Sequence, residues 1–408
     1  MKCRHCKTPL KHVFLNLGYA PHSNAYLNQN QLSHPEKEFP LKLFVCHNCW
    51  LVQTEDYSNR ADLFTEDYAY FSSVSSSWLK HSQHYAEMIQ KRLNLNENSF
   101  VIEVASNDGY LLKNFVAEGI PCVGIEPTDS TADASEKIGV PVIREFFGEE
   151  FAKSLAQHNQ QADLIIGNNV YAHVPDINDF TLGLKTALKP GGTITLEFPH
   201  LLNLIRFKQF DTAYHEHYSY LSLYSVIQIF KMAGLRIFDV EKLTTHGGSL
   251  RVYGCHTEDA RTNTEAVTEL LNEEKEYGMQ DLSVYLSFQN EADKIKSELI
   301  NFLTTQQQNG KKVGAYGAAA KGNTLLNYGK IDNRLISFVC DAAPSKQGKY
   351  LPGSHIPVYH PDQLSESKPD YVLILPWNLK EEISAQINYV RDWGGKLVIP
   401  APELTVLD

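Results

Sequence analysis

Two pairs of cysteines near the N-terminus have the spacing of a metal site. Cys3 is paired with Cys6 and Cys46 with Cys49, each across two intervening residues. Two such thiolate pairs can complete a tetrahedral four-sulfur zinc site. A site of this kind has no open coordination position, so we expect it to stabilise the N-terminal segment rather than to take part in a reaction.

A block of titratable residues in the middle of the chain could move a proton. It reads Tyr214-His215-Glu216-His217. Histidine can accept a proton near neutral pH, and tyrosine can donate a hydrogen bond to a developing oxyanion. If the block is extended, His215 and His217 share one face and Tyr214 and Glu216 share the other. The alternatives are a metal site that also includes His173, and a purely structural role.

A strand that runs into a tight turn and a helix forms a third candidate site. Such a turn lets backbone N–H groups approach a bound nucleotide. Here Glu103 begins the turn that ends at Gly109, and about 20 residues later Glu126 stands where a carboxylate can accept hydrogens from ribose hydroxyls. NAD and S-adenosylmethionine enzymes share this arrangement.

Two details favour S-adenosylmethionine. The Lys-Pro-Gly-Gly turn at 189–192 is common in class I methyltransferases, and the carboxylate of Glu103 suits the cationic methionine end of that cofactor. The predicted cofactor contacts are Glu103, Ala105, Asn107, Asp108, Gly109, Glu126, Pro127, Asn168 and Asn169.

Alternating strands and helices must position these residues. Apolar runs predict strands at 41–45, 100–105, 121–126, 162–167 and 193–198. Aromatic and apolar residues at helical spacing predict a helix at 75–95. Strands that alternate with helices indicate a parallel sheet, whose ligands bind at the carboxyl ends of its strands.

A second α/β unit is expected after an amphipathic helical stretch at 264–308. Its strands are predicted at 312–316, 336–341, 371–375 and 396–399. The small-residue turn that holds Gly317, Lys321 and Asn323 could bind a diphosphate through backbone N–H groups and one ammonium. Asp341 stands where a ribose contact is expected, and close helix–sheet packing is the alternative explanation for the glycines.

Composition limits the remaining possibilities. The chain has 408 residues, enough for two or three domains, and its 43% hydrophobic and 21% charged residues indicate a globular protein. A net charge of -11 argues against nucleic-acid and anionic-membrane partners. The chain has no apolar stretch long enough to span a bilayer and no apolar signal-peptide core at its start, so a cytoplasmic protein is expected.

Three blocks of sequence together resemble one enzyme family. They lie at 103–112, 168–176 and 214–220. They look like the zinc-containing, S-adenosylmethionine-dependent C-methyltransferases, which add a branch methyl to nucleotide-linked keto-deoxysugars. Many of these relatives have glycine where this chain has Ala105.

The resemblance covers the whole chain and implies an α/β protein of three parts. These are a zinc-binding module at 1–65, a class I S-adenosylmethionine methyltransferase domain of Rossmann-like fold at 66–260, and a helix with a Rossmann-like nucleotide-sugar-binding domain at 261–408.

The resemblance also implies a reaction and its residues. Methyl transfer to carbon needs a base that removes the proton beside a ketone and a donor that stabilises the enolate oxygen. His217 is the favoured base. The other family positions and their neighbours correspond to Tyr214, His215, Glu216, His173, Tyr68 and Tyr70. The predicted substrate contacts are Lys321, Gly317, Asn323, Asp341 and His246.

Three other functions are considered. An O- or N-methyltransferase would need a base but no enolate stabiliser. An NAD-dependent nucleotide-sugar oxidoreductase is disfavoured because the chain lacks Gly-x-Gly-x-x-Gly. A noncatalytic zinc scaffold would not need the histidine block.

Overall fold

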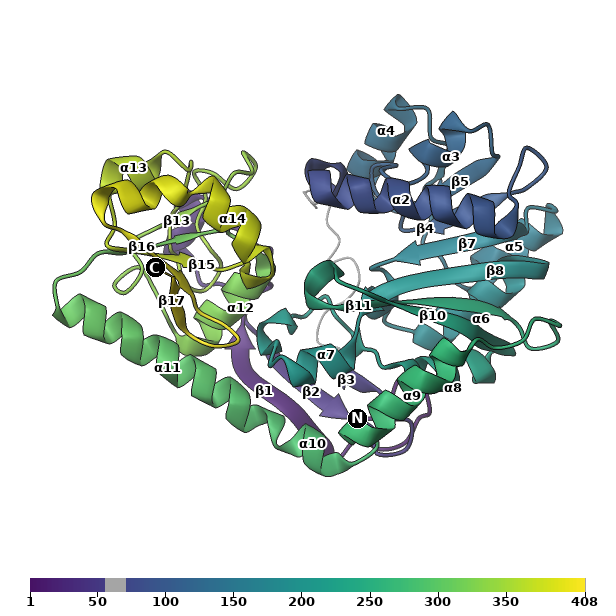
Figure 1. Ribbon diagram of the computed structural model, residues 1–408, viewed down its shortest axis with the longest axis horizontal. Helices are drawn as coiled ribbons and strands as arrows, with labels where there is room; N and C mark the ends of the chain where they lie inside the picture. The colour runs from purple at the N-terminus through teal and green to yellow at the C-terminus, as the bar shows by residue number, and fades with distance from the viewer. Residues whose placement is uncertain (56–70, 408) are drawn as a thin grey trace. The chain divides into compact units, whose positions relative to one another are not determined.

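The computed structural model describes residues 1–55 and 71–407, which form two compact units. Each unit combines separate stretches of the chain (Figure 1). The first unit contains Met1–Leu10, Cys46–His200 and Tyr218–Gln280. The second contains Lys11–Val45, Leu201–His217 and the residues from Asp281 onward. Neither unit is one continuous piece of sequence.

A seven-stranded sheet forms the centre of the first unit, in the order β10-β11-β8-β7-β4-β5-β6. Its strands are β4 (Val101–Val104), β5 (Cys122–Ile125), β6 (Val142–Ile143), β7 (Ala162–Asn168), β8 (Leu188–Pro199), β10 (Leu235–Leu243) and β11 (Ser249–His256). Strands β4 to β8 are parallel, and β10 and β11 are antiparallel. The predicted parallel sheet is confirmed.

Both faces of this sheet are buried. On β4, Val101 belongs to one hydrophobic cluster while Ile102 and Val104 belong to the other. Successive residues of a strand point to opposite faces, so apolar residues are needed at every position of a doubly covered strand. Figure 1 shows α2 on one side of the sheet and α6, α8 and α9 on the other.

The first unit has helices before, between and after the strands of its sheet. They are α2 (Ser76–Leu93), α3 (Lys113–Ala117), α4 (Asp129–Lys137), α5 (Glu149–Gln157), α6 (Ile177–Ala187), α8 (Leu223–Met232) and α9 (Glu265–Tyr277). The predicted helix at 75–95 corresponds to α2, which buries Tyr85 and Ile89. A short antiparallel pair, β3 (Val52–Thr54) with β9 (Ser219–Tyr220), completes this unit.

The second unit has its own six-stranded sheet, in the order β14-β13-β12-β15-β16-β17. The strands are β12 (Val313–Tyr316), β13 (Val339–Cys340), β14 (Val358–Tyr359), β15 (Tyr371–Ile374), β16 (Lys396–Ile399) and β17 (Thr405–Leu407). All pairs are parallel except β16 with β17. Its helices include α7 (Leu201–Arg206), α10 (Leu282–Leu286), α11 (Phe288–Gln308), α12 (Ala320–Gly329), α13 (Gln363–Ser367) and α14 (Lys380–Gln386).

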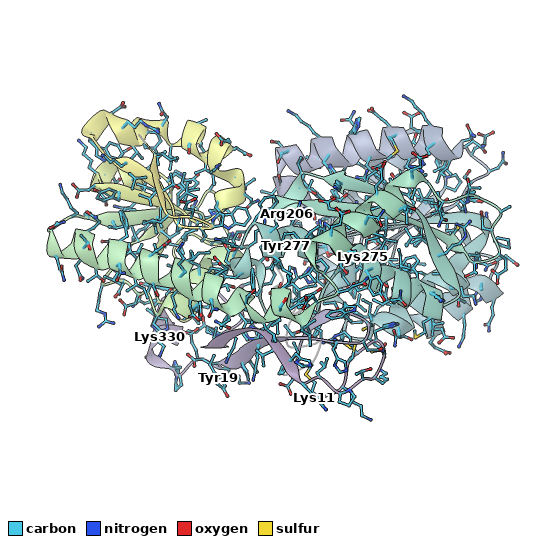
Figure 2. All side chains as sticks on the ribbon, turned by 60° about the horizontal axis from the view of Figure 1, so that its bottom comes forward. Lys11, Tyr19, Arg206, Lys275, Tyr277 and Lys330 are labelled. Carbon is cyan, nitrogen blue, oxygen red and sulfur yellow. The ribbon has the colours of Figure 1, made fainter. Side chains whose placement is uncertain are left out.

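An N-terminal strand pair belongs to the second unit. Strands β1 (His12–Ala20) and β2 (Phe39–Val45) are antiparallel. Phe14 of β1 stacks on Phe288 with ring centroids 4.8 Å apart, which joins this pair to α11. Tyr19 of β1 is exposed, and Lys330, the C-cap that follows helix α12, has a φ of 48°. Both residues are labelled in Figure 2.

Two predicted elements differ from those observed. The helical stretch at 264–308 is three helices, because Gly278 ends α9 in a left-handed conformation and Asp281 begins α10 as its N-cap. The turn at 189–192 lies inside β8 as an irregularity, since Leu188 pairs with Ala162 but Thr193 pairs with Leu164. Within the described ranges, no helix is long and apolar enough to cross a bilayer.

Candidate active site

The four paired cysteines converge, as predicted. Their Sγ atoms all lie within 4.8 Å of one another, with 3.6 Å between Cys3 and Cys49 and 3.5 Å between Cys6 and Cys46. Thiolates bound tetrahedrally at about 2.3 Å from one zinc ion would lie about 3.8 Å apart. The donor set and its spacing therefore fit zinc. In the described part of the chain, no other group of three or more such donors is placed to hold a metal.

The cysteine cluster also supports the chain near His173. Gln53 on β3 donates to the Sγ of Cys3 at 3.2 Å, and its Oε1 accepts from the backbone of Arg4 at 2.8 Å. The side chain of Asn178, at the start of α6, donates to the carbonyl of His5 at 2.9 Å. The first cysteine turn is thus joined to the residues that follow the short helix η3 (Tyr171–His173).

The turn after β4 has three residues in the left-handed region. Ala105, Asn107 and Gly109 have φ values of 56°, 50° and 74°. A Cβ added to Gly109 would lie 2.6 Å from the Oγ of Ser135, so a side chain there would force a shift. Ala105 adopts a conformation that costs an L-residue other than glycine roughly 1 kcal/mol.

Glu126 connects the turns after β4 and β5. Its carboxylate is buried and accepts hydrogen bonds from the backbone N–H groups of Asn107 at 2.9 Å and Thr128 at 3.0 Å. The neighbouring Pro127 is half-buried. Glu126 therefore lies at the carboxyl edge of the sheet, where ligands of parallel sheets bind.

The side chains of the turn anchor the start of the next described segment. The Oδ1 of Asn107 accepts from the backbone N–H of Ser72 at 2.9 Å, and the Oδ2 of Asp108 accepts from that of Ser73 at 3.0 Å. Tyr68 and Tyr70 precede this anchor and lie outside the described residues.

Negative charge gathers around Glu103. Burial raises the pKa of Glu103 well above its usual range; a hydrogen bond from Tyr110 opposes this rise, and the charges of Asp108 and Glu126 add to it. A ligand with positive charge would offset this repulsion and favour the ionised carboxylate. The cluster therefore suits a cationic cofactor better than a neutral one.

The end of β7 offers polar groups to a ligand. Asn168 is 8% exposed, and neither its amide nitrogen nor its amide oxygen has a hydrogen-bond partner among the described residues. Burying such an amide without partners costs free energy, and a bound ligand would recover it. The Nδ2 of the adjacent Asn169 donates a hydrogen bond to the Nε2 of His246 at 3.2 Å, so two predicted site residues are in contact here. His173 is half-buried in η3.

A buried charged network beside these residues was missed from the sequence. The carboxylate of Glu197 on β8 is fully buried and accepts from Arg251 at 3.1 Å, from His81 at 2.9 Å and from Thr245 at 3.0 Å. The pKa of Glu197 is lowered because these partners outweigh its burial, with His81 contributing most. A lone acid inside an apolar strand was the sequence signal that could have revealed the network.

The histidine block is a tight turn rather than an extended segment, so the alternation of faces considered for an extended block does not apply. The backbone N–H of His217 donates to the carbonyl of Tyr214 at 3.0 Å. This bond brings the rings of Tyr214 and His217 to 4.0 Å between centroids. Since the carbonyl of Thr212 can only accept, the hydrogen bond of 3.2 Å requires a proton on the Nδ1 of His217; in the neutral ring, the lone pair that a base requires is then on Nε2.

His215 has different surroundings. Its Nε2 lies 3.2 Å from the carbonyl of Phe39, and its ring is 5.4 Å from that of His22. Burial, with a smaller contribution from His22, lowers the pKa of His215 to about 4. His215 is therefore neutral near pH 7 and packs within the second unit.

The predicted diphosphate turn follows β12 in the second unit. Lys321 donates to Asn378 at 2.7 Å, lies 4.4 Å above the ring of Trp377, and has a pKa lowered by burial. The Oδ2 of Asp341 accepts from the backbone of Ala318 at 2.7 Å and lies 3.5 Å from the ammonium of Lys346.

Gly317 and Asn323 are the other predicted contacts in and after that turn. Gly317 has a φ of 90°, and a Cβ there would meet Pro376 at 2.4 Å, which explains the glycine by close packing. The side chain of Asn323 is buried and donates to the carbonyl of Ser23 at 2.6 Å.

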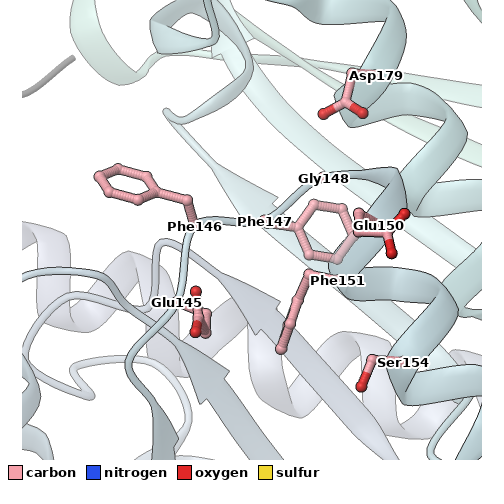
Figure 3. A pocket seen from close by; sticks show the side chains of 8 residues that line it. All are labelled: Glu145, Phe146, Phe147, Gly148, Glu150, Phe151, Ser154 and Asp179. Carbon is pink, nitrogen blue, oxygen red and sulfur yellow. The ribbon is translucent and has the colours of Figure 1, made fainter.

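A hollow of about 450 Å³ lies beyond β6 in the first unit (Figure 3). Its lining is Glu145, Phe146, Phe147, Gly148, Glu150, Phe151, Ser154 and Asp179. It contains none of the predicted site residues. Phe146 is 48% exposed, and Figure 3 shows its ring turned away from that of Phe147.

Comparisons with known proteins identify relatives of this chain. The “C-methyltransferase NovU” of Streptomyces niveus is 32% identical over 406 residues, which cover 100% of this chain and 96% of that protein. Residues 244–402 match the family described as “C-methyltransferase C-terminal domain”, 78–240 match “Methyltransferase domain”, and 3–64 match “Putative zinc binding domain”.

Solved structures match about half of the chain. The magnesium protoporphyrin IX methyltransferase of Synechocystis PCC 6803 with bound SAH is 13% identical, covers 49% of this chain and 89% of its own, and has a TM-score of 0.36. The PH0226 protein of Pyrococcus horikoshii OT3 is 13% identical, covers 49% of this chain and 100% of its own, and has a TM-score of 0.39.

Replacement of a paired cysteine should release the metal. Cys46→Ser removes one of four thiolates, so we expect zinc content to fall from about one ion per chain and the unfolding temperature to drop by roughly 10 °C or more. Elemental analysis and calorimetry measure both. Cys122→Ala, at a buried thiol outside the cluster, should keep the metal; equal zinc loss in both variants would contradict the four-cysteine site.

Ala105→Gly should stabilise the first unit. Glycine adopts the left-handed conformation without the Cβ penalty, so the free energy of unfolding should rise by about 1 kcal/mol, measured by urea denaturation. The same exchange within helix α5, Ala156→Gly, should lower it by about 1 kcal/mol. A loss of stability in Ala105→Gly would show that the turn is not strained.

Proposed function

This chain belongs to the S-adenosylmethionine-dependent C-methyltransferases, and we propose that it methylates the carbon beside the ketone of a nucleotide-diphosphate 4-keto-deoxysugar. The observation that carries the proposal is the contact between Tyr214 and His217 in one turn, at 4.0 Å between ring centroids. It pairs a proton acceptor with a hydroxyl donor, which are the two groups that enolate formation needs.

The proposed reaction begins with a proton transfer. The Nε2 of His217 takes the proton from the carbon beside the ketone. The C–H electron pair becomes the new C=C bond, and the carbonyl pair moves to oxygen, where the hydroxyl of Tyr214 donates a hydrogen bond. The cofactor, when bound, supplies an electrophilic methyl group on a sulfonium. Held by Glu126 and Asn168, the cofactor would offer this methyl to the sugar carbon and would keep the electron pair of the broken S–C bond.

Other predicted residues would position the sugar. Glu216 would accept a hydrogen bond from a sugar hydroxyl or orient His217. His173 and Tyr68 are further candidates for the enolate donor, with Tyr70 beside the latter. His246 would contact the substrate next to Asn169, with which it already shares a hydrogen bond of 3.2 Å.

The cofactor would occupy the carboxyl edge of the first unit's sheet. Glu126 would accept hydrogens from the ribose hydroxyls, and the amide of Asn168 would pair with a polar group of the cofactor. Phe146 follows the outermost strand of the parallel part and would stack on the adenine. Its backbone is held near this edge because the preceding Arg144 forms ion pairs of 2.7–3.1 Å with three carboxylates of α4.

The nucleotide end of the sugar would bind at the turn after β12. Lys321 and the backbone N–H groups that begin α12 would hold the diphosphate. Asp341 and Asn323 would shape the turn through the bonds described above and approach the ribose. We place the protein in the cytoplasm, where its seven cysteines, four of them at the metal site, would stay reduced.

The direct test is methyl transfer to 4-keto-6-deoxy nucleotide sugars in deuterated water. Mass spectrometry should show a product one methyl heavier, with NMR placing the methyl on carbon. His217→Asn should lower kcat by at least about 1,000-fold and leave the Kd of S-adenosylmethionine within about twofold. His360→Asn, at an exposed histidine, is the control. A methyl group on oxygen or nitrogen would refute the proposed chemistry, and loss of cofactor binding in His217→Asn would refute the role of that residue.

The cofactor contacts can be tested by calorimetry alone. Phe146→Ala should raise the Kd of S-adenosylmethionine about tenfold because stacking on the base is lost. Glu126→Gln should raise it by a similar factor through a weaker acceptor at the ribose. Phe207→Ala removes an equally exposed phenylalanine of the second unit, at 47% against 48%, and should leave the Kd unchanged. Equal Kd values for Phe146→Ala and the wild type would remove Phe146 from the site.

A further inference from the structure

Asn24 contacts the carboxylate of Glu216. It lies in the segment after β1, and its Nδ2 donates to Oε1 at 3.0 Å and to Oε2 at 3.3 Å. Asn24 is exposed, whereas Glu216 is 5% exposed. The amide therefore covers one side of a carboxylate that is otherwise withdrawn from solvent.

The segment that carries Asn24 is fixed by its neighbours. The carbonyl of Ser23 accepts from Asn323 at 2.6 Å, and the hydroxyl of Tyr26 donates to the carbonyl of Ala318 at 2.6 Å. The adjacent Thr324 donates to the carbonyl of Ala213, which directly precedes the Tyr214–His217 turn, at 2.9 Å. The start of α12 and the residues just before it thus hold both the segment that carries Asn24 and the block that contains Glu216.

The surroundings of Glu216 make its hydrogen bonds important. Burial raises the pKa of Glu216, and the hydrogen bond from Asn24 opposes that rise. The titratable group that faces it from the same segment as Asn24 is Tyr26, whose own pKa is raised by burial and then by the charges of Asp341 and Glu216. On its own turn, Glu216 is flanked by the histidines at 215 and 217. Lys346 lies 5.7 Å above the ring of Tyr26.

We propose that Asn24 is a positioning residue that keeps Glu216 as an oriented, ionised hydrogen-bond acceptor for the reaction. An amide suits this role because it donates without carrying charge, so the carboxylate keeps its strength as an acceptor. A lysine in its place would neutralise the carboxylate. The reaction part of this inference rests on the proposed function; the effect on Glu216 does not.

The first experiment measures the ionisation of Glu216 without substrate. Infrared difference spectra across a pH titration, with those of Glu216→Gln subtracted, isolate its carboxylate band. Asn24→Ala should raise the titration midpoint by about one pH unit, and Asn24→Asp should raise it further because two carboxylates would then compete for one charge. Asn30→Ala, at an exposed asparagine further along the segment, should leave the midpoint unchanged. An unchanged midpoint in Asn24→Ala would overturn the proposal.

The second experiment is a double-mutant cycle on methyl transfer at pH 7. Asn24→Ala should lower kcat/KM about tenfold in the wild type but less than about twofold in Glu216→Gln, because its target is then already lost. The acidic limb of the pH profile of kcat/KM should move to higher pH in Asn24→Ala. Additive losses in kcat/KM, or an acidic limb that does not move, would show that Asn24 has only a structural role. A raised infrared midpoint in a protein that methylates no keto-sugar would overturn the proposed function and leave the Asn24–Glu216 interaction standing.

Discussion

The shared metal site of four cysteines is the constraint on which the rest of the structure depends. Most of the residues between the two pairs, Lys11–Val45, fold into the second unit, while both pairs belong to the first. Binding one ion to all four thiolates holds the two ends of this segment together and meets the entropic cost of closing the loop. The segment supplies β1, β2 and Asn24 to the second unit.

Buried carboxylates in the first unit fall into two classes. Glu197 is matched by Arg251, His81 and Thr245, so its charge is satisfied by the protein itself. Glu103 lies near Asp108 and Glu126, and their charges add to the rise in its pKa that burial causes. The first class stabilises the fold, and the second fits a site that is completed by a cationic ligand.

The geometry of the histidine block depends on one backbone hydrogen bond. An extended strand would have separated Tyr214 from His217 by alternation, but the bond from His217 to the carbonyl of Tyr214 folds the block into a turn. Residues three apart then face each other, and His215 points elsewhere, towards Phe39. The two histidines of the block therefore differ: His217 is a candidate base with the hydroxyl of Tyr214 as its neighbour, and His215 is buried and neutral.

The sequence by itself determined the features that depend on local spacing and polarity. The Cys-x-x-Cys pairs indicated the metal site, the apolar runs indicated the parallel strands, and the position of Glu126 after its strand indicated that its carboxylate lies at the carboxyl edge of the sheet. Only the tertiary structure decided features that depend on contacts between distant segments. Sequence reasoning could not find the approach of Asn24 to Glu216, the distant partners of Glu197 or the division of the chain between two units, because each joins residues far apart in the chain through packing that no local pattern encodes. The turn at 214–217 also escaped prediction, since short polar blocks carry no periodicity to distinguish a turn from a strand.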